Sequence, residues 1–255
     1  MTTETAVVYG LHAVQSVLEN QANRVSGILL QRGRSDGRIE IIERLARAAG
    51  IVVERRDGHE LDQLCGSARH QGAVARLATA GPMGEGALDD VLDRAGPTPL
   101  VLVLDGVQDP HNLGACLRTA DAAGVHAVVV PRDRAAGLSP TVRKVASGAA
   151  ETTPLIQVVN LARTLRHLKD RGLWLVGTAD ESPQDLYAID LTGPLAIVMG
   201  GEGDGLRRLT RESCDVLVRI PMAGSVASLN VSVATGVALF EATRQRRKGA
   251  GPGRL

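Results

Sequence analysis

The sequence predicts two α/β domains, and three observations carry that prediction. Helix and strand patterns alternate along residues 1–78, glycine and proline interrupt residues 79–98, and apolar strands alternate with helices along residues 99–248. Hydrophobic residues make up 44% and charged residues 22% of the 255 residues, which excludes wholesale disorder and a collagen-like repeat. We expect the glycine-rich, basic residues 249–255 to form a disordered tail.

The first domain shows short helices and strands in alternation. Apolar residues recur at helical spacing in two segments, and three short apolar runs between and after them are typical of strands. The expected helices cover residues 11–18 and 39–46, and the expected strands cover 27–30, 51–53 and 72–77. The pattern therefore predicts a compact α/β unit over residues 1–78.

Residues 79–98 hold Gly81-Pro82, Gly84, Gly86 and Gly96-Pro97, which break any long element. We interpret this segment as a linker with at most one short helix over 88–94. The following strands are apolar along their whole length, so both of their faces are buried, and helices separate them. The expected strands cover residues 100–104, 125–130, 155–158, 173–176, 195–199 and 216–220, and the expected helices cover 113–123, 161–169 and 229–247. This pattern predicts a parallel sheet with crossover helices.

Several classes of protein are excluded by composition. The longest uncharged apolar stretch, residues 226–240, is too short and too rich in Ser, Thr and Asn to span a bilayer. The chain starts without a basic segment and an apolar run, so we expect no secretory signal. Cys65, Cys116 and Cys214 are far apart and odd in number, which favours a reducing, cytoplasmic location.

Charge and aromatic content limit the partners. The net charge is +1, so nucleic acid would have to bind to local patches. Tyr9, Trp174, Tyr187 and Phe240 are the only aromatic residues, too few for a surface that stacks several bases. None of the six histidines has metal-ligand spacing, so we expect no metal site.

Ligands of open parallel sheets bind beyond the carboxyl ends of the strands, so the loops after residues 104, 176, 199 and 220 are the informative ones. In the first of them, Asn112 either caps a helix that begins at Leu113 or contacts a ligand. Arg118 either pairs with Asp121 three residues on or presents a fixed cation to a phosphate.

The later two loops are also ambiguous by themselves. The segment 200–205 has four glycines around Glu202 and Asp204; it is either a flexible turn or a backbone pressed against a ligand. It fits neither a Rossmann fingerprint nor a Walker loop. In the last loop, Ser228 is either a helix cap or, with Asn230 and Ser232, part of a polar helix start that suits a ligand or a partner helix.

Taken together, these loops resemble the three motifs of the SpoU-type RNA ribose 2′-O-methyltransferases of the SPOUT superfamily. The order and spacing of all three motifs agree. The resembling segments are Asp109-Pro110-x-Asn112-x-Gly114-x-x-x-Arg118, Met199-Gly200-Gly201-Glu202-Gly203, and Ile220-Pro221-Met222 with Ser228-Leu229-Asn230-Val231-Ser232. The likeness extends over nearly the whole chain up to Arg247, and it is greatest to the members that methylate a guanosine of bacterial 23S rRNA.

The resemblance implies a fold and partners that the residues alone do not show. The C-terminal domain would contain a deep trefoil knot, and the N-terminal domain would be a small ribosomal-protein-like RNA-binding domain that presents 23S rRNA. The protein would be a homodimer in which each active site is completed across the interface. The target would be a guanosine in the peptidyl-transferase region.

The resemblance also implies a cofactor site. S-adenosyl-L-methionine would lie bent in the knot, held mostly by backbone groups. The residues that correspond to this site are Thr178, Gly200, Gly201, Ile220, Met222 and Leu229. No metal ion would be needed, because the donor is already activated.

The catalytic set that the resemblance implies is Asn112, Arg118, Glu202, Ser228 and Asn230. The family assigns to Arg118 an action on the 2′-hydroxyl, even as a general base. An arginine is always protonated in proteins, so we expect Arg118 to hold the adjacent phosphate and to stabilise the developing alkoxide. Asn112 would orient the ribose or Arg118, and Glu202 would order Arg118 or its own loop.

Two other functions stay open from the sequence. One is a 2′-O-methyltransferase that acts on tRNA, and the other is a non-catalytic rRNA-binding assembly factor. The N-terminal domain favours rRNA by analogy. The presence of Asn112, Arg118, Glu202 and Asn230 argues against a pure binder, which has no need for all four.

Overall fold

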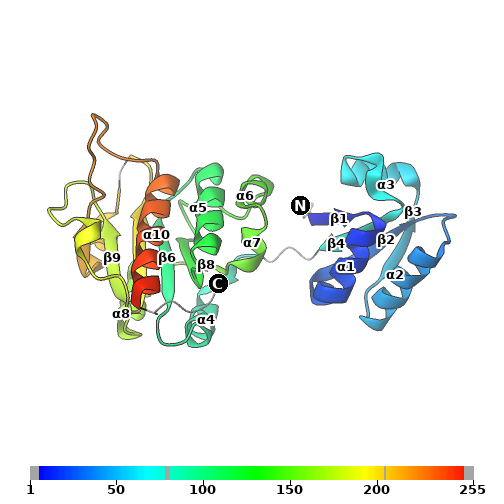
Figure 1. The fold of residues 1–255 in the computed structure, drawn as a ribbon, viewed down its shortest axis with the longest axis horizontal. Coiled ribbons are helices and arrows are strands. Elements are labelled where there is room, and N and C mark those ends of the chain that lie inside the picture. Colours follow the sequence, from blue (N-terminus) through cyan, green and yellow to red (C-terminus); the bar gives the residue numbers. More distant parts are fainter. Residues whose placement is uncertain (1–5, 78–80, 204, 250–255) are drawn as a thin grey trace. The chain divides into compact units, whose positions relative to one another are not determined.

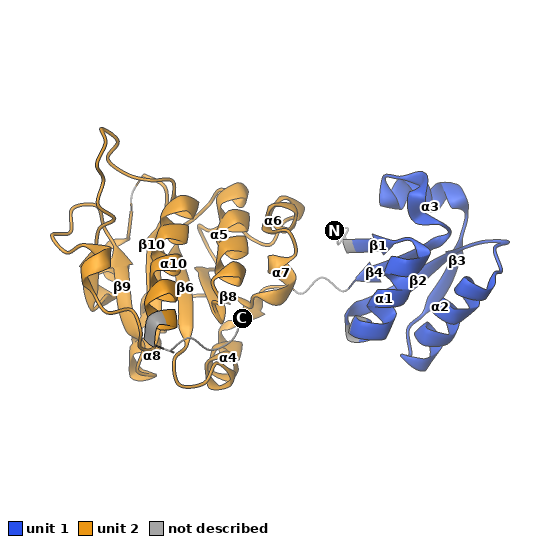
Figure 2. Cartoon of the chain, viewed as in Figure 1, with its two compact units in different colours: residues 1–80 blue, residues 81–255 orange. Residues whose placement is uncertain are grey.

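The computed structural model describes residues 6–77, 81–203 and 205–249. The chain divides into two compact units, Met1–Ala80 and Gly81–Leu255 (Figure 2). The expected tail over residues 249–255 lies outside the described residues except for Gly249, which ends the last helix. No helix in the described ranges is both long and apolar enough to cross a membrane.

The N-terminal unit is a four-stranded sheet with helices. Its strands lie in the order β1 (Ala6–Tyr9), β4 (Ala73–Leu77), β2 (Val25–Gln31) and β3 (Val53–Arg56). The central strand β4 runs antiparallel to β1 and β2, and β2 runs parallel to β3. The helical elements are α1 (Leu11–Gln21), η1 (Ala22–Arg24), α2 (Gly37–Ala48), α3 (Gly58–Cys65) and η2 (Ala68–His70).

The apolar residues that predicted helices over 11–18 and 39–46 face this sheet. Val14 and Leu18 of α1 and Ile39 and Ile42 of α2 are buried in one core with Ile28 of β2. β1 and α3 were not predicted from the sequence, and the strand expected over residues 51–53 begins only at the last of these residues, Val53. Both missed elements are short, with four and eight residues, so their periodicity is weak.

The C-terminal unit is built on a seven-stranded sheet in which every pair of neighbours is parallel, as predicted (Figure 1). The strand order is β11 (Val216–Val218), β9 (Trp174–Thr178), β10 (Leu195–Gly200), β6 (Leu100–Asp105), β7 (Ala127–Pro131), β8 (Leu155–Val158) and β5 (Met83–Gly84). The central strands β10 and β6 end together, with Met199 beside Leu104 and Gly200 beside Asp105. Their carboxyl ends therefore bring two of the predicted loops to one edge.

Helices cover both faces of this sheet. The alternate residues of β6 separate into two cores: Leu102 packs with α5 and α10, and Val103 packs with α4 and α8. The helical elements are η3 (Glu85–Ala87), α4 (Leu88–Arg94), α5 (Pro110–Ala122), α6 (Pro140–Ala146), α7 (Ala149–Thr152), α8 (Leu161–Asp170), η4 (Leu186–Ala188), α9 (Arg208–Ser213) and α10 (Val231–Gly249). This burial on both faces explains why the strands are apolar throughout.

The expected linker over residues 79–98 is too long. Residues 83–94 form β5, η3 and α4, and they belong to the C-terminal unit. Leu88, Val91 and Leu92 are each at most 5% exposed and pack in one core with β6 and α8. The glycines and prolines around this segment separate short elements, which the composition alone does not distinguish from a flexible connection.

The helix that carries the first motif begins earlier than expected. Asp109 is its N-cap and accepts a hydrogen bond from the backbone nitrogen of His111 (2.9 Å), with Pro110 in the first turn. The capping role considered for Asn112 is therefore wrong. Because Asp109 satisfies the helix end, the Asn112 side chain is available for other contacts.

Candidate active site

A cavity of about 480 Å³ opens at the carboxyl edge of the parallel sheet. Its lining comes from five segments: the end of β9 and the loop after it, the end of β10 with its glycine loop, one residue of α9, the end of β11 with the segment that follows it, and the start of α10. Thr178, Gly200, Gly201, Ile220, Met222 and Leu229, the six residues assigned to the cofactor, all line it. Three chain segments that are distant in sequence thus meet at one place.

The glycine loop after β10 is closely packed. A Cβ atom on Gly200 would lie 2.2 Å from the carbonyl carbon of Gly205, and one on Gly201 would lie 2.6 Å from the carbonyl oxygen of Gly106. No side chain fits at either position without a shift of backbone. The flexible-turn interpretation of this loop is therefore wrong for Gly200 and Gly201, whose backbones form part of the cavity wall.

Three polar side chains from three different segments form a hydrogen-bonded chain beside the cavity. The Nδ2 atom of Asn112 donates to Oε1 of Glu202 (2.5 Å), and its Oδ1 atom accepts from Nδ2 of Asn230 (3.0 Å). Asn230 also caps α10, since its Oδ1 accepts from the backbone nitrogen of Ser232 (2.9 Å). The chain of bonds ties the glycine loop to the N-terminal ends of α5 and α10.

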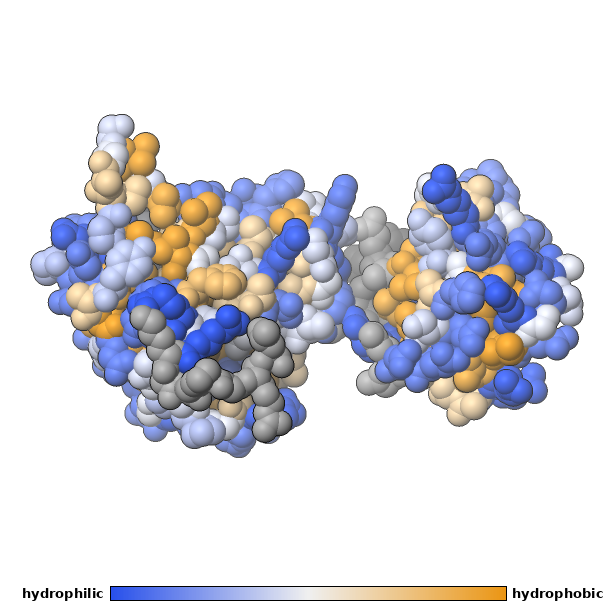
Figure 3. All heavy atoms as spheres, viewed as in Figure 1, coloured by the Kyte–Doolittle hydropathy of each residue, from blue (hydrophilic) through white to orange (hydrophobic). Residues whose placement is uncertain are grey.

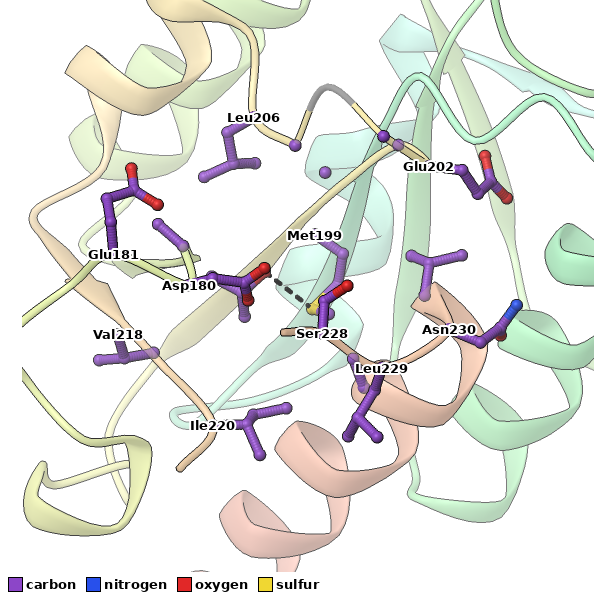
Figure 4. Close-up of a pocket in the computed structure, with 18 of the residues that line it drawn as sticks. Asp180, Glu181, Met199, Glu202, Leu206, Val218, Ile220, Ser228, Leu229 and Asn230 are labelled. Atoms are coloured by element: carbon purple, nitrogen blue, oxygen red, sulfur yellow. Dashed lines mark hydrogen bonds between the residues drawn. The ribbon is translucent and has the colours of Figure 1, made fainter. Parts of the chain in front are cut away.

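Ser228 has a different place from the one considered for it. The helix begins at Val231 and is capped by Asn230, so Ser228 is not the cap. Ser228 is exposed and lines the cavity, where Figure 4 draws it with Leu229 and Asn230. Its hydroxyl can therefore offer a hydrogen bond to a ligand.

The opposite side of the cavity is acidic. Figure 4 shows Asp180 and Glu181 across from Glu202 and Asn230. Glu181 forms an ion pair with Arg211. The pKa of Glu181 is lowered mainly by a backbone hydrogen bond at Glu181 itself and next by Arg211. Asp180 makes no hydrogen bond or ion pair with the described residues. A cationic group would find an unpaired carboxylate here.

Asp180, Glu181 and Arg211 were not predicted from the sequence. The loop after residue 176 was among the informative ones, because it follows the carboxyl end of a parallel strand. This loop has no glycine cluster and no motif, so its position after the strand was the only sequence signal of a ligand site. Arg211 lies in α9, whose place beside the cavity depends on the tertiary fold.

Arg118 does not line the cavity. It lies on the exposed side of α5, and it makes no hydrogen bond or ion pair with the residues that the structure describes. The ion pair considered with Asp121 is also not formed, because Asp121 accepts hydrogen bonds from the hydroxyls of Thr152 (2.6 Å) and Thr153 (3.3 Å). Of the five predicted catalytic residues, the chain itself brings four together and leaves Arg118 facing outward.

Cys116 lies near the site but inside the core. Cys116 is fully buried between α5 and α10, where its thiol lies 3.6 Å from the hydroxyl of Thr235, and burial raises its pKa to about 11. In the described ranges, no three His, Cys, Asp or Glu side chains form a cluster that could hold a metal ion.

Comparison with known families places this geometry in a class. The model of the SpoU rRNA methylase family matches residues 99–240, and the model of the RNA 2′-O ribose methyltransferase substrate-binding domain matches residues 7–83. The chain belongs to the SpoU rRNA methylase family, which confirms the resemblance read from the three motifs.

Curated relatives extend the likeness over both units. The 23S rRNA (guanosine-2′-O-)-methyltransferase RlmB of Pseudomonas putida is 57% identical over 240 residues, which cover 94% of this chain and 96% of that protein. RlmB of Ralstonia nicotianae is 56% identical over 244 residues, which cover 96% of this chain and 97% of that protein.

Solved structures show the same fold. The SpoU methyltransferase AviRb from Streptomyces viridochromogenes, in complex with the cofactor AdoMet, has a TM-score of 0.70 at 26% identity over 95% of this chain and 91% of its own. The AdoMet-bound rRNA methyltransferase from Sinorhizobium meliloti has a TM-score of 0.72 at 24% identity over 94% of this chain and 87% of its own.

Proposed function

We propose that this protein transfers a methyl group from S-adenosyl-L-methionine to the ribose 2′-hydroxyl of a guanosine in 23S rRNA. The observation that carries the proposal is the meeting of all three family motifs at one cavity. The relatives named for this reaction match both units at 56–57% identity, which supports the same substrate. The intact polar chain from Asn112 to Glu202 and Asn230 favours an enzyme over a pure RNA binder.

The cavity fits the cofactor in size and chemistry. Pockets for ligands of this size hold about 300–1,000 Å³, and this one holds about 480 Å³. Leu206, Val218, Ile220 and Leu229 offer apolar contacts for an adenine ring, and the tight Gly200-Gly201 backbone offers peptide groups. The unpaired carboxylate of Asp180 suits a positively charged part of the molecule. When bound, S-adenosylmethionine supplies an activated methyl group on its sulfonium.

The residues of the chain supply orientation and charge. Asn112, fixed from both sides by Glu202 and Asn230, holds the end of α5 against the glycine loop and so positions the ribose. Ser228 and Asn230 offer hydrogen bonds at the start of α10. The Arg118 guanidinium keeps its proton, so it holds the phosphate beside the target ribose and stabilises negative charge on the 2′-oxygen while the hydroxyl proton passes to solvent water.

Arg118 performs this role in the cavity of a second subunit. Arg118 and Thr119 are neighbours on α5. Helix α10 packs against α5, with Gly236 next to Thr119, and leaves Arg118 exposed beside it. On α10, Val233 and Phe240 are 52% and 49% exposed, although both are apolar. Figure 3 shows apolar atoms in the region where Figure 1 places α10 and α5. We therefore propose a homodimer joined through this α5/α10 face.

The remaining parts of the proposal follow family membership. The N-terminal unit binds and presents the rRNA, in line with its match to the substrate-binding domain, and the protein works in the cytoplasm where ribosomes are assembled. The C-terminal unit contains a deep trefoil knot; the likeness to AviRb supports it. Experimental electron density traced continuously through residues 195–231 tests the knot.

Methyl transfer to defined RNAs tests the function. Purified protein and labelled S-adenosylmethionine are incubated with 23S rRNA fragments and, separately, with total tRNA, and the modified nucleotide is identified by mass spectrometry. We expect 2′-O-methylguanosine in an rRNA fragment only. Methylated tRNA would indicate the tRNA enzyme, and RNA binding without methylation would indicate an assembly factor.

Arg118→Ala tests the catalytic assignment. We expect methyl transfer to fall by at least about a hundredfold, which corresponds to the loss of one group that stabilises transition-state charge. Affinity for S-adenosylhomocysteine, measured by calorimetry, should stay within about twofold of the parent, because Arg118 acts on the RNA phosphate and the 2′-oxygen, whereas other residues line the cofactor cavity. Near-normal turnover of the variant would show that Arg118 is not catalytic.

A further inference from the structure

A second cavity, of about 390 Å³, opens at the carboxyl edge of the same sheet. It lies beside the ends of β7 and β8, and its wall includes the loops that follow these strands and the beginning of α9. Among the described residues, none lines both cavities. Since ligands of open parallel sheets bind at this edge, the position alone makes the second cavity a candidate site.

The two cavities are adjacent through one loop. The segment after β10 lines the active-site cavity as far as Leu206, and the next residue, Arg207, begins the part that lines the second cavity. A ligand that extends beyond the first cavity along the sheet edge crosses only this loop before it reaches the second. An RNA strand is such a ligand: when one nucleotide is held at the first cavity for methylation, the adjacent nucleotide extends beyond it.

The lining of the second cavity is cationic. It contains Arg134, Arg207 and Arg208, against a single acidic residue, Asp133. Arg134 is exposed and makes no hydrogen bond or ion pair with any described residue. Its backbone has φ of +58°, a left-handed conformation that an arginine rarely adopts and that fixes where the side chain leaves the loop.

Arg207 is anchored by a buried carboxylate. Asp105 ends β6, its side chain is fully buried, and it accepts hydrogen bonds from the backbone nitrogen of Arg207 (3.0 Å) and from its Nε atom (2.5 Å). The Arg207 side chain remains 44% exposed. The carboxylate therefore orients Arg207 at the cavity wall and balances its charge, so Arg134 and Arg208 supply the charge for a ligand. Arg208 is 76% exposed, and its ion pair with Glu212 (2.8 Å) lies in solvent, where such a pair is weak and can be exchanged for a phosphate.

Apolar side chains lie next to these arginines. Val159 and Leu209 line the same cavity and are 62% and 54% exposed, so both present apolar surface to a ligand there. Guanidinium groups bind phosphate, and aliphatic side chains contact the faces of a sugar or a base. A site with both kinds of side chain suits a nucleotide better than a free inorganic anion.

We propose that the second cavity binds a backbone phosphate of the substrate RNA, on a nucleotide next to the one that is methylated. The inference rests on the proposed function for the identity of the RNA. Arg134 and Arg208 neutralise the phosphate, and Val159 and Leu209 contact the attached nucleoside. The site adds affinity and fixes the direction of the strand over the loop that separates the two cavities.

Removal of the Arg134 and Arg208 charges tests the site. The variant is Arg134→Gln with Arg208→Gln. Arg207 is left in place, because its loss would leave the buried Asp105 carboxylate without its charged partner. The matched control is Arg94→Gln with Arg166→Gln, which removes two exposed arginines on α4 and α8 that do not line the cavity.

The measurement is the affinity of the full-length protein for a 23S rRNA fragment that the parent protein binds, from 50 to 200 mM salt. Loss of the one neutralised single-strand phosphate should reduce the slope of log affinity against log salt by about 0.7, and affinity at low salt should fall by at least about tenfold. Equal slopes for the test variant and the control would overturn the site.

Two further measurements separate the possible sources of failure. Inorganic phosphate is titrated into the parent protein and the test variant; saturation that the variant loses, with an unchanged RNA slope, would assign the cavity to free phosphate and overturn the RNA assignment. Methyl transfer by the parent protein reports on the proposed function independently. A reduced slope in a protein without methyl transfer would support the subsite and contradict the enzyme. Unchanged calorimetric binding of S-adenosylhomocysteine shows that the variant is folded.

Discussion

Asn112 shows how one side chain connects the site at the scale of a residue. Its amide donates to Glu202 and accepts from Asn230, so both ends of the amide are used and its orientation is fixed. Neither partner is deeply buried, so each bond contributes only about 0.5–1.5 kcal/mol to stability. Its larger effect is positional, because it fixes the glycine loop relative to two helices.

A change of one side-chain group tests this arrangement. Asn112→Asp replaces the donor that faces Glu202 by a second carboxylate, so we expect repulsion, a looser loop and at least about a tenfold loss of methyl transfer. Adding Glu202→Gln in the double variant restores a donor opposite the new carboxylate. A double-mutant cycle on the free energy of unfolding should then give a favourable coupling of about 0.5–3 kcal/mol. No coupling would show that the bond does not form in solution.

Cys116 gives a pH dependence at the same scale. Burial raises its pKa to about 11, above the value of 9.0 that an exposed thiol has in the unfolded chain. The unfolded chain therefore loses this proton first, so the contribution of Cys116 to stability is complete below pH 9 and is lost as the pH rises toward 11. Urea unfolding at pH 8, 9, 10 and 11 measures it.

The control for this measurement is Cys116→Ala. Other groups titrate in the same range, but the difference between the two proteins isolates Cys116. We expect the parent to lose more stability than the variant by up to about 1.4 kcal/mol for each pH unit in the window. Parallel pH profiles would contradict the raised pKa.

At the scale of elements, close approach between α5 and α6 supports the motif helix. Gly114 makes this possible: a Cβ atom there would lie 2.7 Å from Cβ of Val145 and 2.8 Å from the carbonyl oxygen of Val142. Alanine is the better helix former by about 1 kcal/mol, yet the helices would have to separate to hold it. Packing decides the outcome.

We therefore expect Gly114→Ala to destabilise the fold by about 1–3 kcal/mol, measured by urea unfolding. Gly236→Ala on α10 is the matched control, since its Cβ would lie 3.7 Å from Cγ2 of Thr119, an ordinary contact. The control should be neutral or more stable by up to about 1 kcal/mol. If both variants changed the free energy of unfolding in the same direction, helix propensity and not the close approach of α5 and α6 would determine the effect at Gly114.

The elements also show what sequence reasoning could reach. Long apolar strands such as β6 were predicted because burial on both faces leaves a continuous pattern. Helix α6 was missed because its seven residues end at Ser147 and Gly148, both with left-handed backbone, which shortens any periodicity. The motif loops were selected because they follow the carboxyl ends of predicted parallel strands, and the family resemblance then assigned roles to their residues. Asp180 was not selected, because its role depends on a cavity that only the fold creates.

At the scale of the whole molecule, one chain does not bring all five predicted catalytic residues together. Four of the five predicted catalytic residues meet at the cavity or in the hydrogen-bonded chain beside it, and the fifth, Arg118, lies on the exposed side of α5. The exposed apolar residues of the adjacent α10 lie on the face through which we propose that two chains pair. Dimerisation and catalysis are then linked, because the interface that buries Phe240 also delivers Arg118 to the neighbouring cavity.

Phe240→Asp tests this link. Burial of a phenylalanine contributes about 1.5–3 kcal/mol in each subunit, so losing both copies should raise the dimer dissociation constant by at least about a hundredfold. We expect a monomer by sedimentation at micromolar concentration, with methyl transfer lost and S-adenosylhomocysteine still bound. Val52→Asp, at a 66%-exposed valine of the N-terminal unit, is the control and should stay dimeric and active. A Phe240→Asp monomer that methylates rRNA at the parent rate would contradict a site shared between subunits, because Arg118 would then act without a partner.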